Sequence, residues 1–324
     1  MYVHDGRNPE PYTSRRGAIG EAAGSITLQR VADVITLPYR WICALEVDFP
    51  PGSGRQPTTV KSTGVLISPR HVLTAAHNVA KRDPPARPDQ VSGDRVDAVR
   101  VRVTPGLDST KSLAGRRSPV GSVDLKPGDW WIPSQYFPAS LLCWDFAVLT
   151  LPKELPLVNK MTYGHWSDPR YAPRTALAPV AEGSLVGSTV SFAGYAAGNC
   201  SRSCTPCDGS SAAPDSIPLS KGWLATQAES SGLVVPGGRV HNDEGIVLFT
   251  GQTCVGMAGS PVWQKSGSLR LVALHLSSNL KVPYQSPGSR TGYDQRFHVG
   301  LPMRDEIVGL LRQRLAIDHV VPTF

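Results

Sequence analysis

Three short segments contain residue types that can carry out acid–base chemistry on a substrate. His77 lies at the end of an expected strand, within the run Leu-Thr-Ala-Ala-His-Asn-Val over 73–79, and Asp145 directly precedes the apolar run 146–151. A glycine-rich turn, Cys-Val-Gly-Met-Ala-Gly-Ser-Pro-Val over 254–262, leads into another strand-like run. An imidazole can move a proton, and a carboxylate can hold its second N–H. The backbone N–H groups of a tight glycine turn can bind a developing negative charge.

The order of these segments resembles the trypsin/chymotrypsin-like serine peptidases. Thr-Ala-Ala-His, Asp-Phe-Ala-Val-Leu and Gly-Met-Ala-Gly-Ser-Pro-Val stand where that family has its three signatures, and the resemblance covers about residues 30–317. It implies an all-β fold, a chymotrypsin-like double six-stranded β-barrel with a C-terminal α-helix. It also implies that His77 is the general base and that Asp145 orients it. The N–H groups of Gly256 and Ala258 would then bind the oxyanion.

One position departs from the family pattern, because Ala258 stands where the family has its nucleophilic serine. Ser260 matches the residue before the proline and should not reach His77. We therefore expect a serine endopeptidase framework without activity, since removing the nucleophile removes most of the rate enhancement. An engineered Ser→Ala change would leave the other parts in place, as seen here. A natural pseudoprotease that binds peptides is the alternative, although it would often have lost His77 or Asp145 as well.

Within the superfamily, the chain looks most like the glutamyl endopeptidases. Their ending is Thr-x-x-Gly-x-Ser-Gly-Ser-Pro-Val, and Thr253 falls at the matching threonine. His275 lies where the resemblance places the histidine that binds an acidic side chain at P1, the residue before the scissile bond. Leu276 and Ser277 would present backbone to an extended peptide. The simpler interpretation of His275 is a barrel-core histidine, and that of Asp145 is a strand-end cap, with Glu154 the only other nearby carboxylate.

Other positions limit the expected specificity and regulation. Gln252 is neutral where a trypsin-like pocket would carry its carboxylate, so a preference for Arg or Lys lacks its usual partner. Met257 replaces the carboxylate that would receive a freed N-terminus, so activation by that ion pair is not expected. Ser62 and Asn78 stand where two cysteines usually form a bridge near the catalytic histidine, which fits a reducing compartment. A regulatory partner could act through the N-terminal arm or the 196–222 insertion.

Three closely spaced cysteines invite a metal hypothesis. Cys200, Cys204 and Cys207 could bind Zn²⁺ with His241 or Cys254 as a fourth ligand. Thiols on a loop or a local disulfide are the simpler alternatives, and the sequence favours them together. We therefore predict no cofactor and treat these cysteines as weak metal candidates.

Many short strand-like runs separated by turns favour a barrel or sandwich. Near the end, Met303, Ile307, Leu311 and Leu315 recur at four-residue steps, which predicts an amphipathic helix. The predicted organisation is a flexible arm over 1–24, a peptidase domain over 25–317 with barrels at about 30–165 and 166–300 and a helix over 302–316, and a tail over 318–324.

The composition of the chain limits the classes of molecule that it is expected to bind. The chain has 324 residues, 31 Gly, 29 Pro and a net charge of +7, with 40% hydrophobic and 18% charged residues. The basic residues are scattered and no nucleic-acid motif is present, so we expect a protein or peptide substrate and no nucleic acid. No apolar run is long enough for a membrane span. No secretory signal is visible, which predicts a cytoplasmic location, or a secreted one if a signal was removed.

Overall fold

The structure is a computed structural model. It describes residues 28–51, 57–82, 95–108, 118–137, 142–156, 163–166, 168, 179–180, 184–197, 200–202, 226–235, 245–264, 269–284 and 293–319. The predicted arm over 1–24 and most of the 196–222 insertion lie outside these residues. In the described part of the chain, no helix is long and apolar enough to cross a membrane.

The N-terminal half forms a curled antiparallel sheet of seven strands. Its order is β8 (Val123–Leu125), β7 (Arg100–Pro105), β2 (Ile42–Phe49), β3 (Thr58–Leu66), β4 (His71–Thr74), β10 (Ala147–Thr150) and β9 (Trp130–Trp131). In β7, Val101 and Val103 are buried while Arg100 and Arg102 are half-buried on the other face. This is the period-two pattern of a strand with one face in the core.

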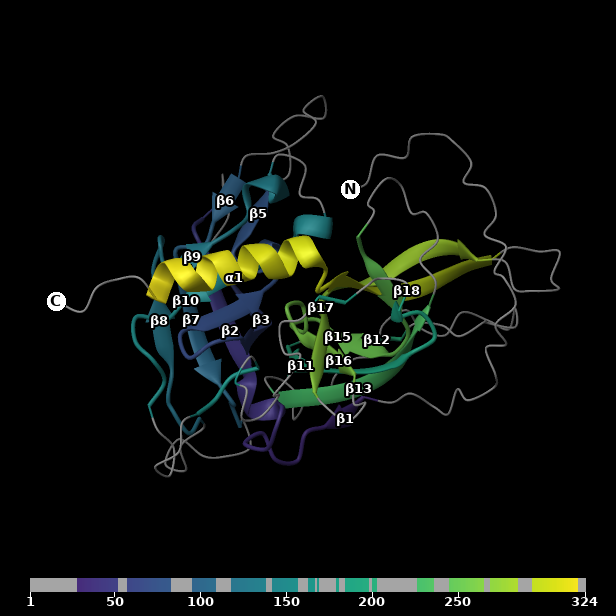
Figure 1. Ribbon diagram of the computed structural model, residues 1–324, viewed down its shortest axis with the longest axis horizontal. Helices are drawn as coiled ribbons and strands as arrows, with labels where there is room; N and C mark the ends of the chain where they lie inside the picture. Colours follow the sequence, from purple (N-terminus) through teal and green to yellow (C-terminus); the bar gives the residue numbers. More distant parts are fainter. Residues whose placement is uncertain are drawn as a thin grey trace.

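The C-terminal half forms a second antiparallel sheet of seven strands, visible beside the first in Figure 1. Its order is β1 (Gln29–Arg30), β13 (Thr226–Val235), β11 (Thr189–Ala196), β16 (Pro261–Gln264), β17 (Arg270–Tyr284), β18 (Tyr293–Pro302) and β14 (Val247–Phe249). An additional pairing of β13 with β14 closes six of these strands into a ring. Closure pairs the backbone groups that an open sheet would leave at its edges.

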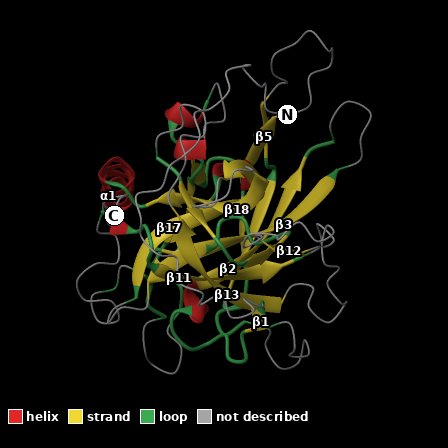
Figure 2. Cartoon of the chain, turned by 90° about the vertical axis from the view of Figure 1, so that its right-hand side faces the viewer, coloured by secondary structure: helices red, strands yellow, loops and turns green. Residues whose placement is uncertain are grey.

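The predicted double barrel is confirmed, with one added short edge strand in each sheet. Without the two-residue strands β1 and β9, each sheet has the six strands that were expected. Figure 2 shows that strands dominate the described residues and that α1 lies to one side of them.

Short elements complete the chain. They are the strand pairs β5 (Ala80–Arg82) with β6 (Arg95–Asp97) and β12 (Cys200–Arg202) with β15 (Gln252–Cys254), and the 3₁₀ turns η1 (Tyr39–Trp41), η2 (Ala76–Asn78), η4 (Ser134–Tyr136) and η5 (Leu142–Trp144).

The C-terminal helix α1 spans Asp305–His319, whereas the sequence placed it over 302–316. It starts later because Pro302 is the last residue of β18 and the N–H of Met303 still donates to the Val272 carbonyl oxygen. Met303, Ile307 and Leu311 are fully buried in the same core cluster as strands of the N-terminal sheet. The C-terminal helix therefore covers the N-terminal barrel (Figure 1).

Three tryptophans join the two halves of the core. Trp166 lies between Trp41 and Trp263, with ring centroids 5.5 and 5.7 Å away, and all three side chains are fully buried. Trp41 ends η1 and Trp263 lies in β16, so this contact spans both barrels. Burying side chains of this size contributes about 1.5–3 kcal/mol or more each, which holds the barrels against one another.

Candidate active site

His77 lies in the turn η2, and Asp145 lies between η5 and β10 of the first barrel. The His77 Nδ1 atom is 2.6 Å from Asp145 Oδ2, and the His77 backbone N–H donates to Asp145 Oδ1 at 2.9 Å. The Asp145 side chain is 3% exposed and that of His77 is 37% exposed. The carboxylate is therefore a fixed acceptor for Nδ1–H, which leaves Nε2 of the imidazole as the nitrogen that can exchange protons. Glu154, the other carboxylate considered, is exposed.

The environment of His77 favours its protonated form. Burial by itself lowers the pKa of His77, but the negative charge and the hydrogen bond of Asp145 outweigh it. The pKa of His77 is therefore raised above its ordinary value. When its ring is neutral, His77 can accept a proton, and Asp145 then stabilises the imidazolium that forms.

The turn from Gly256 to Ser260 depends on two glycines. Gly256 has a φ of 97° and Gly259 a φ of 86°, both in the left-handed region that side chains rarely adopt. A Cβ on Gly256 would lie 2.5 Å from the Tyr195 carbonyl oxygen, and one on Gly259 would collide with the carbonyl oxygen of Thr63. Between them the Met257 side chain is fully buried, and its Sδ atom accepts the Cys254 N–H at 3.3 Å.

Hydrogen bonds from the first barrel fix this turn. The Ala258 carbonyl oxygen accepts the Thr63 N–H and the Asn78 side-chain N–H, each at 3.0 Å. Thr63 Oγ1 donates to the Gly256 carbonyl oxygen at 2.8 Å. Asn78 also donates to Thr74 Oγ1 at 2.9 Å. Since Asn78 directly follows His77, the same short segment holds both the imidazole and position 258.

Position 258, where the sequence analysis expected a nucleophile, lies in this turn and has the methyl side chain of alanine. Within the described part of the chain, neither the Gly256 nor the Ala258 N–H donates to a protein acceptor. Both are therefore available to a substrate oxyanion. Ser260 does not replace the missing hydroxyl, because it is fully buried and its Oγ donates to the Met257 carbonyl oxygen at 2.6 Å.

A second pair of histidines lies in the C-terminal barrel. His298 Nε2 is 2.9 Å from the Gly251 carbonyl oxygen, and its Nδ1 is 3.2 Å from Thr253 Oγ1. A carbonyl can only accept, so Nε2 carries the proton and Nδ1 accepts from the Thr253 hydroxyl. The rings of His275 and His298 are 5.8 Å apart and meet edge to face.

Both of these histidines are kept neutral. Burial lowers the pKa of His298 to about 4, while its bond to Gly251 opposes the shift. Burial, followed by the influence of His298 and His77, lowers the pKa of His275 well below its ordinary value. The Val299 backbone opposes this shift, and Nδ1 of His275 is buried with no hydrogen-bond partner. This buried nitrogen is therefore an unsatisfied hydrogen-bonding group.

The predicted peptide-binding segment forms the end of a strand ladder. Strand β17 pairs with β16 as far as the Pro261–Leu274 pair, and the His275 N–H and carbonyl then bond to Ser260 and Gly259. Beyond this point Ser277 is exposed, whereas the Leu276 side chain is 1% exposed and lies in the core. A peptide could therefore contact the backbone of Leu276 but not its side chain, which is buried.

The sequence analysis overlooked two groups of residues. One is His298, which lies 45 residues after Thr253 and outside every recognised motif. The other is the hydroxyl pair Thr63 and Thr74, which connects the turn to the first barrel through a bond from Thr74 Oγ1 to the Thr63 carbonyl at 2.7 Å. Only the positions of Ser62 and Asn78, where cysteines were expected, pointed toward this region.

A reducing compartment would keep the cysteines as thiols, and one cysteine of the structure differs from this expectation. Cys254 is disulfide-bonded, and the backbone register of β12 and β15 places Cys200 opposite it. Cys254 is therefore not available as a zinc ligand. Cys204, Cys207 and His241 lie outside the described residues. In the part that is described, no cluster of three metal-ligating residues occurs.

Comparisons with known proteins agree with this geometry. Residues 62–274, more than half of the chain, match the family described as trypsin-like peptidase domain. A solved structure titled a Glu endopeptidase in complex with MPD matches with a TM-score of 0.54 and 20% identity, covering 90% of this chain and 98% of that chain. At this identity the likeness concerns the fold. No curated protein matches the sequence. The family match shows that this chain belongs to the trypsin-like peptidases.

Proposed function

We propose that this chain carries the site of a serine endopeptidase that cleaves after Glu or Asp, and that Ala258 has removed its hydrolytic step. The observation that carries the proposal is the bonding of one segment, His77 and Asn78, to both Asp145 and the turn at position 258. In this proposal His77 is the base that acts on a nucleophile at position 258. Without it, the family membership would give only the fold.

The proposed reaction needs a hydroxyl at position 258. A serine oxygen there would attack the peptide carbonyl carbon and pass its proton to His77 Nε2. The N–H groups of residues 256 and 258 would bind the carbonyl oxygen as it becomes negative. When the C–N bond breaks, His77 would return the proton to the leaving amine, and water would then hydrolyse the ester by the same route. The methyl group of Ala258 can neither attack nor donate, which costs a rate factor on the order of 10⁶.

The acidic P1 preference is supported by His275. Its Nδ1 is the buried nitrogen without a partner, whereas the hydroxyl of Thr253 is engaged with His298. The negative charge of a bound carboxylate would favour uptake of a proton from solvent by His275, and the resulting imidazolium would donate a charge-assisted hydrogen bond from Nδ1 to the carboxylate. In this proposal Thr253 and His298 position His275 rather than touch the substrate.

The test compares Ala258→Ser with the parent chain and with Ala258→Gly, which also lacks a hydroxyl. The substrates are two peptides that differ only in Glu or Gln at P1, and cleavage is followed by mass spectrometry. We expect cleavage by the serine variant alone, at least tenfold faster after Glu than after Gln. Equal rates after Glu and Gln would refute the acidic preference. A folded serine variant that cleaves neither peptide nor any of a P1-varied library would refute the peptidase site.

A second function, peptide binding without hydrolysis, is favoured by the intact remainder of the site. Ala258 leaves the turn, its N–H groups and the His77–Asp145 pair in place. The parent chain should therefore bind the Glu peptide and leave it uncut. This behaviour is also that of the natural pseudoprotease considered above.

A further inference from the structure

Two neighbouring segments fix the backbone at Asp145. After Asp145 the chain enters β10, whose first residue Ala147 pairs with Thr74 of β4 in the first barrel. Before Asp145 lies the 3₁₀ turn η5, and the Asp145 N–H donates to the Leu142 carbonyl oxygen of that turn at 3.2 Å. The position of the carboxylate therefore depends on what holds η5 as well as on β10.

The second barrel contacts η5 through apolar side chains. Leu142 packs against the small core cluster of Leu248, Phe297 and Val299, which belong to β14 and β18. The turn that precedes Asp145 is thus packed against the second barrel, whereas the strand that follows Asp145 belongs to the first.

A polar contact with η5 comes from Arg304, the residue before α1. Its Nη2 donates to the Cys143 carbonyl oxygen at 2.9 Å, and its Cζ lies 5.0 Å from the centroid of the Trp144 ring. Hydrogen bonds from an ionised donor are shorter and stronger than neutral ones, and a guanidinium is attracted to the face of an indole. Glu306 lies 3.6 Å from Arg304 Nε but is 66% exposed, so it holds the guanidinium less firmly. Arg304 therefore contacts the two residues that directly precede Asp145.

The backbone beside Arg304 is itself fixed by the second barrel. The Met303 N–H donates to the Val272 carbonyl oxygen at 2.9 Å, and the Met303 carbonyl oxygen accepts the Val180 N–H at 2.8 Å. The Arg304 side chain is 22% exposed, and a Cβ on Gly245 would collide with its guanidinium. The side chain is therefore confined at the end of β18, from which α1 crosses to the first barrel (Figure 1).

We propose that Arg304 is a positioning residue for Asp145, because it ties η5 to the second barrel and so holds the carboxylate where it accepts the His77 Nδ1–H. In the proposed reaction Arg304 acts through Asp145 and not on the substrate. The catalytic part of this inference rests on the proposed function, whereas the effect on the His77–Asp145 pair needs neither a nucleophile nor a peptide. A misplacement of about 1 Å can cost on the order of 10²-fold in rate.

The first measurement is the pH midpoint at which the His77 ring titrates, followed by NMR in the parent chain. Asp145 raises the pKa of His77 against the effect of burial, so moving the carboxylate away should lower this midpoint. Asp145→Asn defines the full decrease. We expect Arg304→Met, which keeps an apolar side chain, to give about a third of that decrease or more. Arg304→Lys should recover part of it, because an ammonium can still donate to a carbonyl oxygen.

The second measurement is steady-state cleavage of the Glu peptide in the Ala258→Ser background. Arg304→Met should lower kcat about tenfold to a hundredfold and change KM less than about twofold, because the P1 residues stay in place. Arg304→Lys should lie between the two. Thermal unfolding checks that each variant is folded. If Arg304→Met does not fold, Arg304→Gln replaces it, with both changes expected in the same direction.

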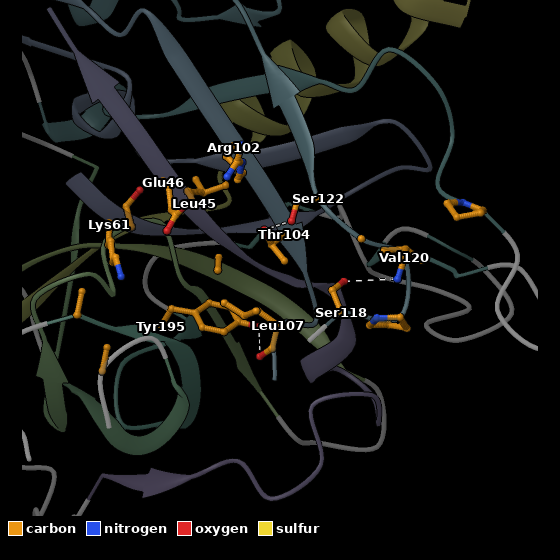
Figure 3. Close-up of a pocket in the computed structure, with 17 residues that line it drawn as sticks. Leu45, Glu46, Lys61, Arg102, Thr104, Leu107, Ser118, Val120, Ser122 and Tyr195 are labelled. Atoms are coloured by element: carbon orange, nitrogen blue, oxygen red, sulfur yellow. Dashed lines mark hydrogen bonds between the residues drawn. The ribbon is translucent and has the colours of Figure 1, made fainter. Parts of the chain in front are cut away.

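Arg102→Met is the matched control for the loss of a bonded arginine. Arg102 lies in β7 of the first barrel and donates to Asp124 through Nε at 2.8 Å and Nη2 at 3.0 Å. It lines a pocket of about 710 Å³, shown in Figure 3, which is lined neither by His77 or Asp145 nor by a residue of η5. This variant should leave the His77 midpoint unchanged.

The outcomes separate this inference from the proposed function. If a folded Arg304→Met or Arg304→Gln variant keeps the parent midpoint of His77, Arg304 does not hold Asp145 and the proposal is wrong, even where the unfolding temperature falls. If the midpoint falls but kcat in the Ala258→Ser background does not, the proposal is wrong for catalysis. If Ala258→Ser cleaves no peptide while the midpoint still falls, the proposed function fails and the positioning of Asp145 by Arg304 stands.

Discussion

Two histidine sites in this molecule use the same side chain for opposite purposes. His77, in the first barrel, has a buried carboxylate at 2.6 Å and a partly exposed ring, and its pKa is raised. His275 and His298, in the second barrel, are fully buried next to each other and to Phe192 and Phe249, and the pKa of each is lowered. The first site favours the protonated imidazolium of its histidine, and the second site favours the neutral imidazole.

The difference shows that the partner of an imidazole decides its chemistry. Desolvation acts on all three rings and disfavours the imidazolium. Only His77 has a carboxylate that outweighs this effect. Under the proposed function, a bound acidic side chain would do for His275 what Asp145 does for His77.

The largest expected effect comes from removing the carboxylate of the first site. In the Ala258→Ser background, Asp145→Asn should lower kcat on the order of 10⁴-fold, because the amide favours the wrong tautomer of His77. Glu154→Gln is the control and should leave kcat unchanged, since that carboxylate is exposed. Steady-state cleavage of the Glu peptide measures both. A loss of less than tenfold with Asp145→Asn would mean that this carboxylate does not orient the base.

A medium effect is expected for stability in acid. The pKa of His298 is about 4 in the folded chain against 6.5 for an unperturbed histidine, so the unfolded state binds more protons between these values. The folded state should lose about 2 kcal/mol from this residue as the pH falls from 7 to 5. His298→Phe should abolish this part of the loss, as measured by urea unfolding at both pH values.

His77→Gln tests the same property from the other site. A histidine with a raised folded pKa stabilises the folded state at low pH and loses that contribution as the pH rises through the folded pKa. Replacing His77 should therefore not relieve the loss in acid. If it relieved that loss as His298→Phe does, the contrast between the two sites would be wrong.

The smallest expected effects are shifts in the pH midpoints at which the three histidines titrate. In an NMR titration of the ring protons, His77 should titrate above 6.5, His298 should stay neutral until about pH 4, and His275 should titrate well below 6.5. Adding the Glu peptide should raise the midpoint of His275 alone. A midpoint above 6 for His298 in the peptide-free chain would contradict the neutral pair.

Local patterns in the sequence were sufficient for the fold class and for the order of the three signatures. Strand β7 followed from its alternation, because a strand with one buried face must repeat every two residues. The start of α1 was less well determined. Pro302 looked like a helix start, but a tertiary bond from Met303 to Val272 keeps this stretch in the sheet.

The sequence by itself determined which residues are present, including the alanine at position 258 and the two glycines that allow its turn. Tertiary structure alone decided that Thr63 and Asn78 hold that turn and that the His298 ring packs edge to face against the His275 ring. The reason is physical. A glycine turn is a local preference of φ and ψ, whereas these contacts join residues far apart in the chain and form only once the two barrels pack together.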